Sequence, residues 1–213
     1  MNLIPTSSTY FILLVTIALG IMSGCSSKPT RYYSLSAMSE SKTPLSPTIA
    51  QNVSLGIGPI EIPDYANRPQ IVTRNGNHEL VFEEFHQRAE PLDKNISRVL
   101  TNNLAALIGT QNITSYPMAR FEPTDYRVSI DITKFETAKG GTTTLEARWK
   151  ILSSEDKKRI IRKNSSIVKI NDGDDYEAII AAESEALAAL SEEIRDAIFS
   201  LMNDDGVASI EES

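Results

Sequence analysis

The sequence is poor in the residues that form disulfides, metal sites and catalytic pairs. It contains one cysteine and two histidines in 213 residues. A single cysteine cannot close a disulfide within the chain, and it cannot supply a cysteine-rich zinc site. We therefore expect the fold to be stabilised by an apolar core, with no metal and no cofactor.

The sequence also lacks an excess of positive charge. It has 21 Lys and Arg residues against 28 Asp and Glu, which gives a formal net charge of −7. Nucleic-acid binding depends on clustered cations that neutralise phosphates. The acidic balance argues against a nucleic-acid partner, and against electrostatic attraction to anionic lipid surfaces.

No catalytic motif is present. The sequence contains no nucleophile elbow (GxSxG), no phosphate-binding glycine loop and no HExxH pair. His78 and His86 are the only imidazoles, and we expect solvent-exposed positions for both. The sequence therefore predicts that the protein is not an enzyme.

Long apolar stretches are confined to the N-terminus. Residues 10–22 form an uncharged run of about thirteen mostly apolar residues, followed by the polar segment SSKPTR. A membrane-spanning helix needs roughly 20 apolar residues, so this run is too short. It is typical of the apolar region of a secretory signal peptide, which predicts that residues 1–24 are removed.

The only cysteine directly follows this run. Met22-Ser23-Gly24-Cys25 resembles a bacterial lipobox, in which the thiol is alkylated with diacylglycerol and the new N-terminus is acylated, for example with palmitate. Two or more acyl chains make membrane anchoring stable. Cys25 is therefore the predicted lipid attachment site, with a free thiol or an intermolecular disulfide as the alternatives. Ser26 and Ser27 resemble the signal for delivery to the outer membrane, on its periplasmic side.

The rest of the chain divides into three parts. Residues 25–52 are predicted to be a lipidated N-terminus and linker, because the stretch from Ser34 is rich in Ser, Pro, Thr and Ala. A short strand at Tyr32–Ser36 is an option within it. Residues 53–203 are predicted to form a single domain, and residues 204–213 an acidic tail.

The domain combines strands and two main helices. Residues 126–132 and 145–151 alternate apolar and polar side chains, as half-buried strands do, and Asn75-Gly76 and Lys139-Gly140-Gly141 are turn signals. Apolar residues at helical spacing predict helices over about 91–108 and 174–202. Asp93 and either Asp174 or Asp175 are the expected caps. The prediction is an α+β fold with a largely antiparallel sheet.

Several segments together resemble the PqiC/YmbA family of ABC-type, MCE-associated transport auxiliary lipoproteins. The matching residues are Gly56, Gly58 and Pro59, then Pro63 and Tyr65, then Arg68 to Val72 with Arg74, and finally Glu90 to Leu92. The later strands and the Ala-rich terminal helix match in order. One departure is Arg88, at a position where the family often has Trp.

The resemblance implies a non-catalytic outer-membrane lipoprotein of an intermembrane phospholipid transport system. Its partner would be an MCE-domain periplasmic tube, docked at the outer membrane, and a homo-oligomeric ring could receive that tube. The alternatives are a periplasmic lipid-binding carrier lipoprotein and a structural envelope lipoprotein. The candidate partner contacts lie in the segment from Pro63 to Arg74, and are Tyr65, Arg68, Pro69, Gln70 and Arg74. Alternatively, this segment only sets a rigid turn and a local ion pair.

Overall fold

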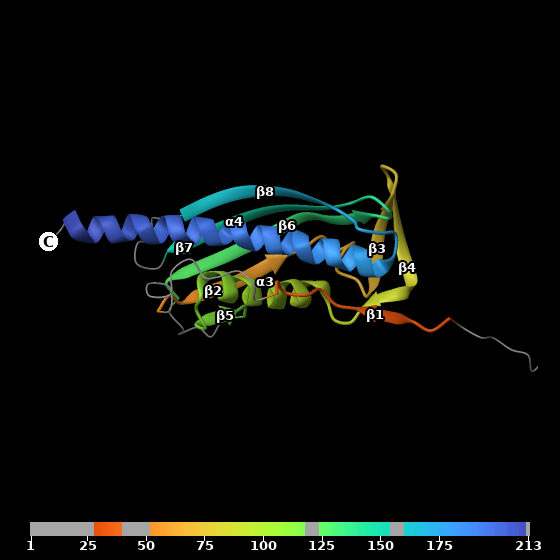
Figure 1. Ribbon diagram of the computed structural model, residues 1–213, viewed down its shortest axis with the longest axis horizontal. Helices are drawn as coiled ribbons and strands as arrows, with labels where there is room; N and C mark the ends of the chain where they lie inside the picture. The colour runs from red at the N-terminus through yellow and green to blue at the C-terminus, as the bar shows by residue number, and fades with distance from the viewer. Residues whose placement is uncertain (1–27, 40–51, 118–123, 154–159, 212–213) are drawn as a thin grey trace, which may run out of the picture.

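A computed structural model describes residues 28–39, 52–117, 124–153 and 160–211 of the chain. It contains eight strands and two helices within these ranges (Figure 1). In chain order they are β1 (Arg31–Tyr33), β2 (Leu55–Glu61), β3 (Gln70–Asn75), β4 (Glu79–Arg88), α3 (Leu92–Ile108), β5 (Ile113–Ser115), β6 (Tyr126–Ala138), β7 (Thr142–Ser153), β8 (Ile160–Ile170) and α4 (Tyr176–Glu211). Among the described residues, no helix has the length and apolar character that a membrane span requires.

The strands form one curled sheet with both helices on its inner face. The strand order is β1-β4-β3-β6-β2-β5, and β7 pairs with β6 and then with β8. Strand β6 is paired with β7 along one edge. Along its other edge it pairs first with β2, at Tyr126–Asp131, and then with β3, at Thr137 and Ala138. The segment 62–69 leaves this edge between the two strands.

The prediction of an α+β fold with two main helices is confirmed, but the prediction of a largely antiparallel sheet is wrong. Of the seven strand pairings among the described residues, four are parallel. Strands that follow one another closely in the sequence pair antiparallel, as expected for β3–β4, β6–β7 and β7–β8. In contrast, the chain between β2 and its parallel partners β5 and β6 passes through the β3–β4 hairpin and then α3, and such a long crossover allows it to return in the same direction. The sheet is therefore mixed.

The helices differ slightly from their predicted bounds. α3 covers the predicted range and ends at Gly109, which adopts the left-handed conformation (φ 83°). Asp93 does not cap it, because the helix begins at Leu92 and Asp93 already lies in the first turn. The carboxylate of Asp175 accepts a hydrogen bond from the Ala178 amide (2.8 Å), which confirms an aspartate cap for α4. α4 continues to Glu211, past the predicted end at 202.

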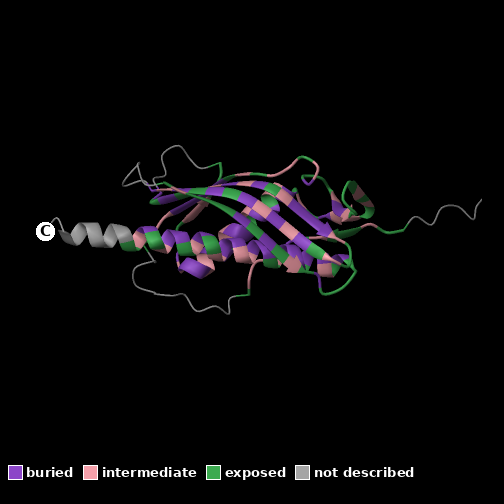
Figure 2. Ribbon diagram, turned by 90° about the horizontal axis from the view of Figure 1, so that it is seen from above, coloured by how far each residue is buried: buried purple, intermediate pink, exposed green. Residues whose placement is uncertain are grey.

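The core lies between the sheet and the helix pair. Buried positions alternate with exposed ones along the long strands, so that one side of each strand packs inward (Figure 2). α4 packs against β7, β8 and α3, and α3 packs against β2 and β5. The largest fully buried side chains are Leu35, Leu55, Ile57, Ile71, Leu92, Ile96, Leu100, Leu104, Ile108, Ile132, Leu145 and Ile151.

Residues 34–38, which the sequence assigned to the linker, pack against α3. The Leu35 side chain is only 2% exposed and belongs to the core. Two buried side-chain amides of α3 accept backbone hydrogen bonds from this segment, Asn95 from Leu35 and Asn103 from Met38, each at 2.8 Å. The ordered domain therefore includes these residues as well as β1.

A buried ion pair joins the sheet to α4. The guanidinium of Arg88, at the end of β4, donates to both carboxylate oxygens of Glu183 at 2.9 and 3.0 Å. The two side chains are 4% and 1% exposed. Arg88, which stands where the resemblance led us to expect Trp, thus fills a buried position with a charge that has a dedicated partner.

We predict that breaking this ion pair is costly. Glu183→Ala leaves the Arg88 guanidinium buried without its counter-charge, and such a change destabilises by about 3–5 kcal/mol. The double variant Arg88→Met/Glu183→Leu removes both charges and should recover most of this loss, because apolar replacement of a buried pair is often neutral or stabilising. Urea denaturation measures both effects.

The exposed pair Arg98–Glu90 is the matched control. Its side chains are 47% and 33% exposed, and Arg98→Ala should cost at most about 1 kcal/mol. If Glu183→Ala is as mild as this control, Arg88 and Glu183 do not hold α4 on the sheet.

Candidate functional site

The predicted lipid attachment site, Cys25, lies outside the described residues. The described chain begins at Lys28 and enters β1 at Arg31. This places the start of the chain at one end of the elongated molecule, next to β4 and the first turn of α4 (Figure 1).

Two of the predicted partner contacts are half-buried and are bound to one carboxylate. Arg74 pairs with Glu136 of β6 through both Nε and Nη2, the latter at 2.6 Å from Oε1. The hydroxyl of half-buried Tyr65 also hydrogen-bonds to Glu136. Burial of the hydroxyl is the main cause, and this hydrogen bond the second, that together raise the pKa of Tyr65 to about 12. The Arg74 hydrogen bond lowers the pKa of the Glu136 carboxyl below its usual 4.5.

The other predicted contacts are more accessible. The Arg68 guanidinium is exposed and lies 4.8 Å from the centre of the Phe82 ring. Pro69 is exposed, while its carbonyl accepts a hydrogen bond from the Arg88 amide (2.6 Å). Gln70 is half-buried in β3, opposite Gln87. Of the five residues, Arg68 and Pro69 are thus the ones that present exposed side chains to a partner.

The fold brings two of the family-like motifs together. The Arg68-Pro69 turn and the Glu90-Pro91 turn line the same cleft, of about 320 Å³, although they are more than twenty positions apart in the sequence. The hydrogen bond between the Pro69 carbonyl and the Arg88 amide fixes one turn against the other. We call this the motif cleft. It is a surface that a partner segment could enter.

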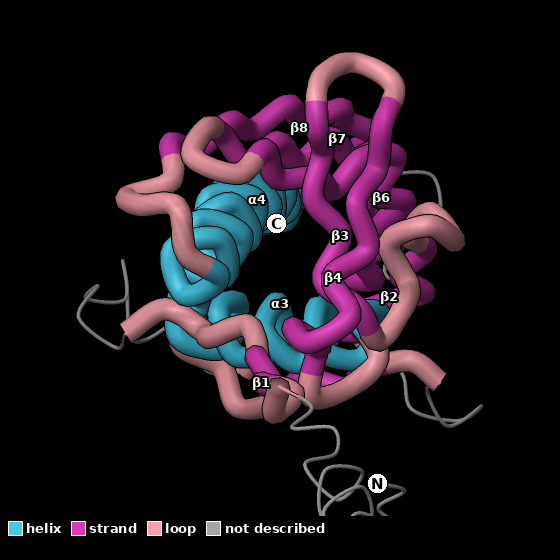
Figure 3. Tube along the Cα trace, turned by 90° about the vertical axis from the view of Figure 1, so that its right-hand side faces the viewer, coloured by secondary structure: helices cyan, strands magenta, loops and turns pink. Residues whose placement is uncertain are grey.

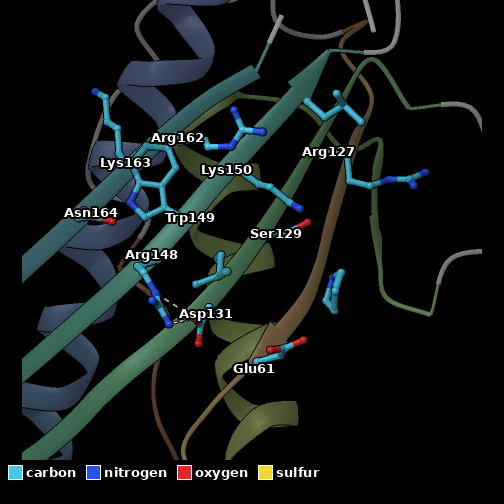
Figure 4. A pocket seen from close by; sticks show the side chains of 13 residues that line it. Glu61, Arg127, Ser129, Asp131, Arg148, Trp149, Lys150, Arg162, Lys163 and Asn164 are labelled. Carbon is cyan, nitrogen blue, oxygen red and sulfur yellow. Dashed lines mark hydrogen bonds and ion pairs between the residues drawn. The ribbon is translucent and has the colours of Figure 1, made fainter. Parts of the chain in front are cut away.

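A second hollow lies on the outer face of the sheet, away from the helices. It is an open groove of about 640 Å³ across β6, β7 and β8, with Pro59 and Glu61 of β2 at its border (Figure 4). Arg127, Lys150 and Arg162 enter it from three adjacent strands, and no ion pair is found for them among the described residues. Arg148 is different, because it pairs with Asp131 at 2.6 Å. We call this the basic groove.

The basic groove was not anticipated from the sequence. Its cations belong to alternating strand positions, and the register places Lys150 directly opposite Arg162. A partial signal was available, since residues 157–163 (KKRIIRK) hold five cations in an otherwise acidic chain. The groove can attract an anionic group or an acidic surface.

His86 does not occupy the exposed position that was expected for it. Its Nδ1 lies 2.9 Å from the Tyr33 hydroxyl, and its ring stacks on Tyr176 at 3.7 Å between centroids. His86 therefore belongs to an aromatic cluster between β1, β4 and α4. His78 is exposed, in the turn between β3 and β4. No group of His, Cys, Asp and Glu that could hold a metal ion occurs within the described part of the chain.

A protein-family model matches residues 33–195, from the last residue of β1 into α4. That model describes the ABC-type transport auxiliary lipoprotein component. The chain belongs to this family. The match confirms the resemblance stated above, and it makes the protein an auxiliary lipoprotein component of an ABC-type transport system.

Solved structures share the auxiliary lipoprotein's fold. A crystal structure of a protein from Xanthomonas campestris is 18% identical, with 83% of this chain and 99% of that chain covered and a TM-score of 0.66. A crystal structure of an uncharacterised protein is 19% identical, covers 80% of this chain and 99% of its own, and has a TM-score of 0.65. No curated protein gives a significant match. At these identities the structures support the fold alone.

We predict that Glu136 makes the stability of this auxiliary lipoprotein depend on acid pH. Its pKa is lower in the folded state, so its contribution is complete above about pH 4.5 and is lost as the pH falls through the folded-state pKa. Glu136→Gln should therefore lower the free energy of unfolding at neutral pH, and that free energy should then fall less between about pH 7 and about pH 4 than in the wild type. Urea denaturation at the two pH values tests this.

Glu146→Gln is the control, because Glu146 pairs with Lys134 at 3.9 Å and the two side chains are 44% and 38% exposed. It should leave the pH dependence close to that of the wild type. An unchanged pH dependence in Glu136→Gln would contradict the assignment.

Proposed function

We propose that this auxiliary lipoprotein is anchored in the outer membrane through Cys25, faces the periplasm, and works without catalysis in an MCE-type phospholipid transport system. The observation that carries the proposal is the family match, which spans the folded domain from β1 to α4. The single cysteine, placed directly after the apolar N-terminal run, supports lipid anchoring.

The physical task in such a system is docking. Exposing a phospholipid tail to water costs about 0.8 kcal/mol for each CH₂ group, so a path between two membranes must be closed along its length. A protein at the outer-membrane end contributes by holding the tube in place. A homo-oligomeric ring of this chain would surround the tube's end.

The motif cleft is the proposed contact for the MCE-domain tube. It joins the Arg-Pro-Gln and Glu-Pro-Leu motifs, and Arg68 and Pro69 expose their side chains beside it. Tyr65 and Arg74 would act indirectly, because Glu136 holds both of them and they fix the segment between β2 and β3.

The packing favours docking over the carrier role. A carrier would need an apolar cavity large enough for acyl chains, whereas the space between the sheet and the helices is filled by side chains such as Ile57, Leu100, Leu145 and Leu187, all fully buried. Both hollows described above are surface features.

We predict that Cys25→Ala releases the protein from the membrane into the soluble periplasmic fraction. Lipid modification requires the sulfur atom, and without acyl chains nothing of comparable strength holds the protein on the bilayer. Fractionation of the envelope, with mass spectrometry of the N-terminal peptide, measures both location and modification. A variant that stays in the outer membrane would refute anchoring through Cys25.

The docking role is tested by native mass spectrometry of the acylated protein, gently cross-linked and purified from its own envelope. We expect a homo-oligomer that carries an MCE-domain partner, and Arg68→Glu should lose that partner. Lys169→Glu, on β8 and outside the motif cleft, is the matched charge reversal and should retain it. A monomer holding one phospholipid would instead support the carrier role.

A further inference from the structure

One end of the domain is held close to the membrane by the length of the chain. The described chain enters β1 at Arg31, six positions after Cys25, and β1 lies at the end of the molecule with β4 and the start of α4 (Figures 1 and 3). Six residues span at most about 21 Å when fully extended. The inference that follows rests on the proposed lipid anchor at Cys25, and it concerns what this end of the domain contacts.

One side of β1 and β4 faces α4 and the other side faces solvent. Tyr33 and His86 form ring contacts with Tyr176 of α4, Glu83 hydrogen-bonds to the Tyr176 hydroxyl, and Arg88 pairs with Glu183. These five residues and Glu183 make up the inner side of this end. Glu83 and His86 are three positions apart, and regular alternation would place them on opposite faces. The β3–β4 ladder is irregular here, because the partner of Gln70 is Gln87 while the partner of Ile71 is Glu83. This irregularity allows Phe82, next to Glu83, and Phe85, next to His86, both to face away from α4.

The outward positions carry exposed aromatic rings. Tyr32 is 65% exposed, Phe82 42% and Phe85 36%. The register places Tyr32 opposite Gln87, two positions from Phe85, so these two rings are diagonal neighbours on one face. The Arg68 guanidinium lies over the Phe82 ring. We call Tyr32, Phe82 and Phe85 the aromatic face.

Elsewhere at this end the charges are mixed. The exposed cations here are Arg31, Arg68 and Lys139, and the exposed carboxylates are Glu79, Glu84, Asp174, Asp175 and Glu177. The aromatic face therefore offers apolar rings beside polar surroundings that carry no excess of positive charge. This composition suits the headgroup region of a bilayer, where aromatic rings are enriched and where apolar area is removed from water.

We propose that the aromatic face inserts into the headgroup region of the membrane in which Cys25 is anchored. The domain then stands with β1 and β4 on the lipid. The basic groove lies over the other half of the sheet, toward the ends of the strands that include Tyr126, Ser153 and Ile160, and it faces the periplasm (Figure 1). Since this end of the domain has no excess of cations, the contact does not require anionic lipid.

The test places a tryptophan on the aromatic face and measures its contact with lipid. Phe82→Trp and Phe85→Trp are made in the acylated full-length chain, which is reconstituted into phosphatidylethanolamine vesicles whose acyl chains carry bromine, a contact quencher of tryptophan fluorescence. Trp149, the only native tryptophan, is 3% exposed, and the wild type supplies its background signal.

The control is Tyr116→Trp. Tyr116 is 55% exposed and follows β5, at the end of the molecule away from β1 (Figure 1). We expect brominated lipid to remove most of the added emission at positions 82 and 85 and little of it at 116. Adding phosphatidylglycerol to the vesicles should not change this pattern.

The outcomes separate this inference from the proposed function. Protein that floats with the vesicles, with no more quenching at positions 82 and 85 than at 116, overturns the membrane contact and leaves the lipid anchor intact. If quenching at 82 and 85 is absent and cross-linking instead captures the aromatic face against a second copy or a partner, the inference is also wrong. A protein without acyl chains on Cys25 would not float at all, and the anchor itself would then fail.

Discussion

The buried pair of Arg88 and Glu183 determines how the two halves of the chain fit together. A guanidinium and a carboxylate that are both removed from water cost several kcal/mol each in lost hydration, and only close mutual contact offsets that cost. Their two hydrogen bonds therefore allow a narrow range of positions for α4 relative to β4. β1 pairs with β4, and α3 packs on α4, so the N-terminal segment and both helices depend on this one register.

The same constraint positions the proposed contact surfaces around β4. Its last residue, Arg88, is anchored inward by Glu183, while the backbone amide of Arg88 holds the Pro69 carbonyl. The Arg88 side chain thus holds β4 against α4, and its backbone amide holds the Arg68-Pro69 turn that lines the motif cleft. A tryptophan at position 88 could fill the same space without the charge. This chain uses Arg88 to stabilise the packing of α4 on the sheet, and it offers no aromatic ring there to a partner.

The sequence predicted most of the local structure because local signals dominate it. Gly109 ends α3, Asp175 caps α4, and Asn75-Gly76 closes a hairpin, each through contacts with near neighbours. Parallel pairing was missed because it depends on where a crossover returns the chain, and alternation along a strand is the same in both orientations. The packing of residues 34–38 was missed for another reason. It depends on Asn95 and Asn103, whose polar side chains interrupt the apolar pattern that identifies a core.

For the candidate sites too, the sequence indicated local features but not the contacts between distant residues. The segment from Pro63 to Arg74 stands out by its specific residues. Its sequence does not show that Tyr65 and Arg74 are half-buried and bound to Glu136, whereas Arg68 and Pro69 are exposed. Glu136 is more than sixty positions away, and only the sharing of one edge of β6 by β2 and β3 brings it there. The motif cleft and the basic groove likewise arise from register between distant strands and turns. Under the proposed docking role, specificity would lie in surfaces that the fold assembles, and such surfaces leave no short motif in the sequence.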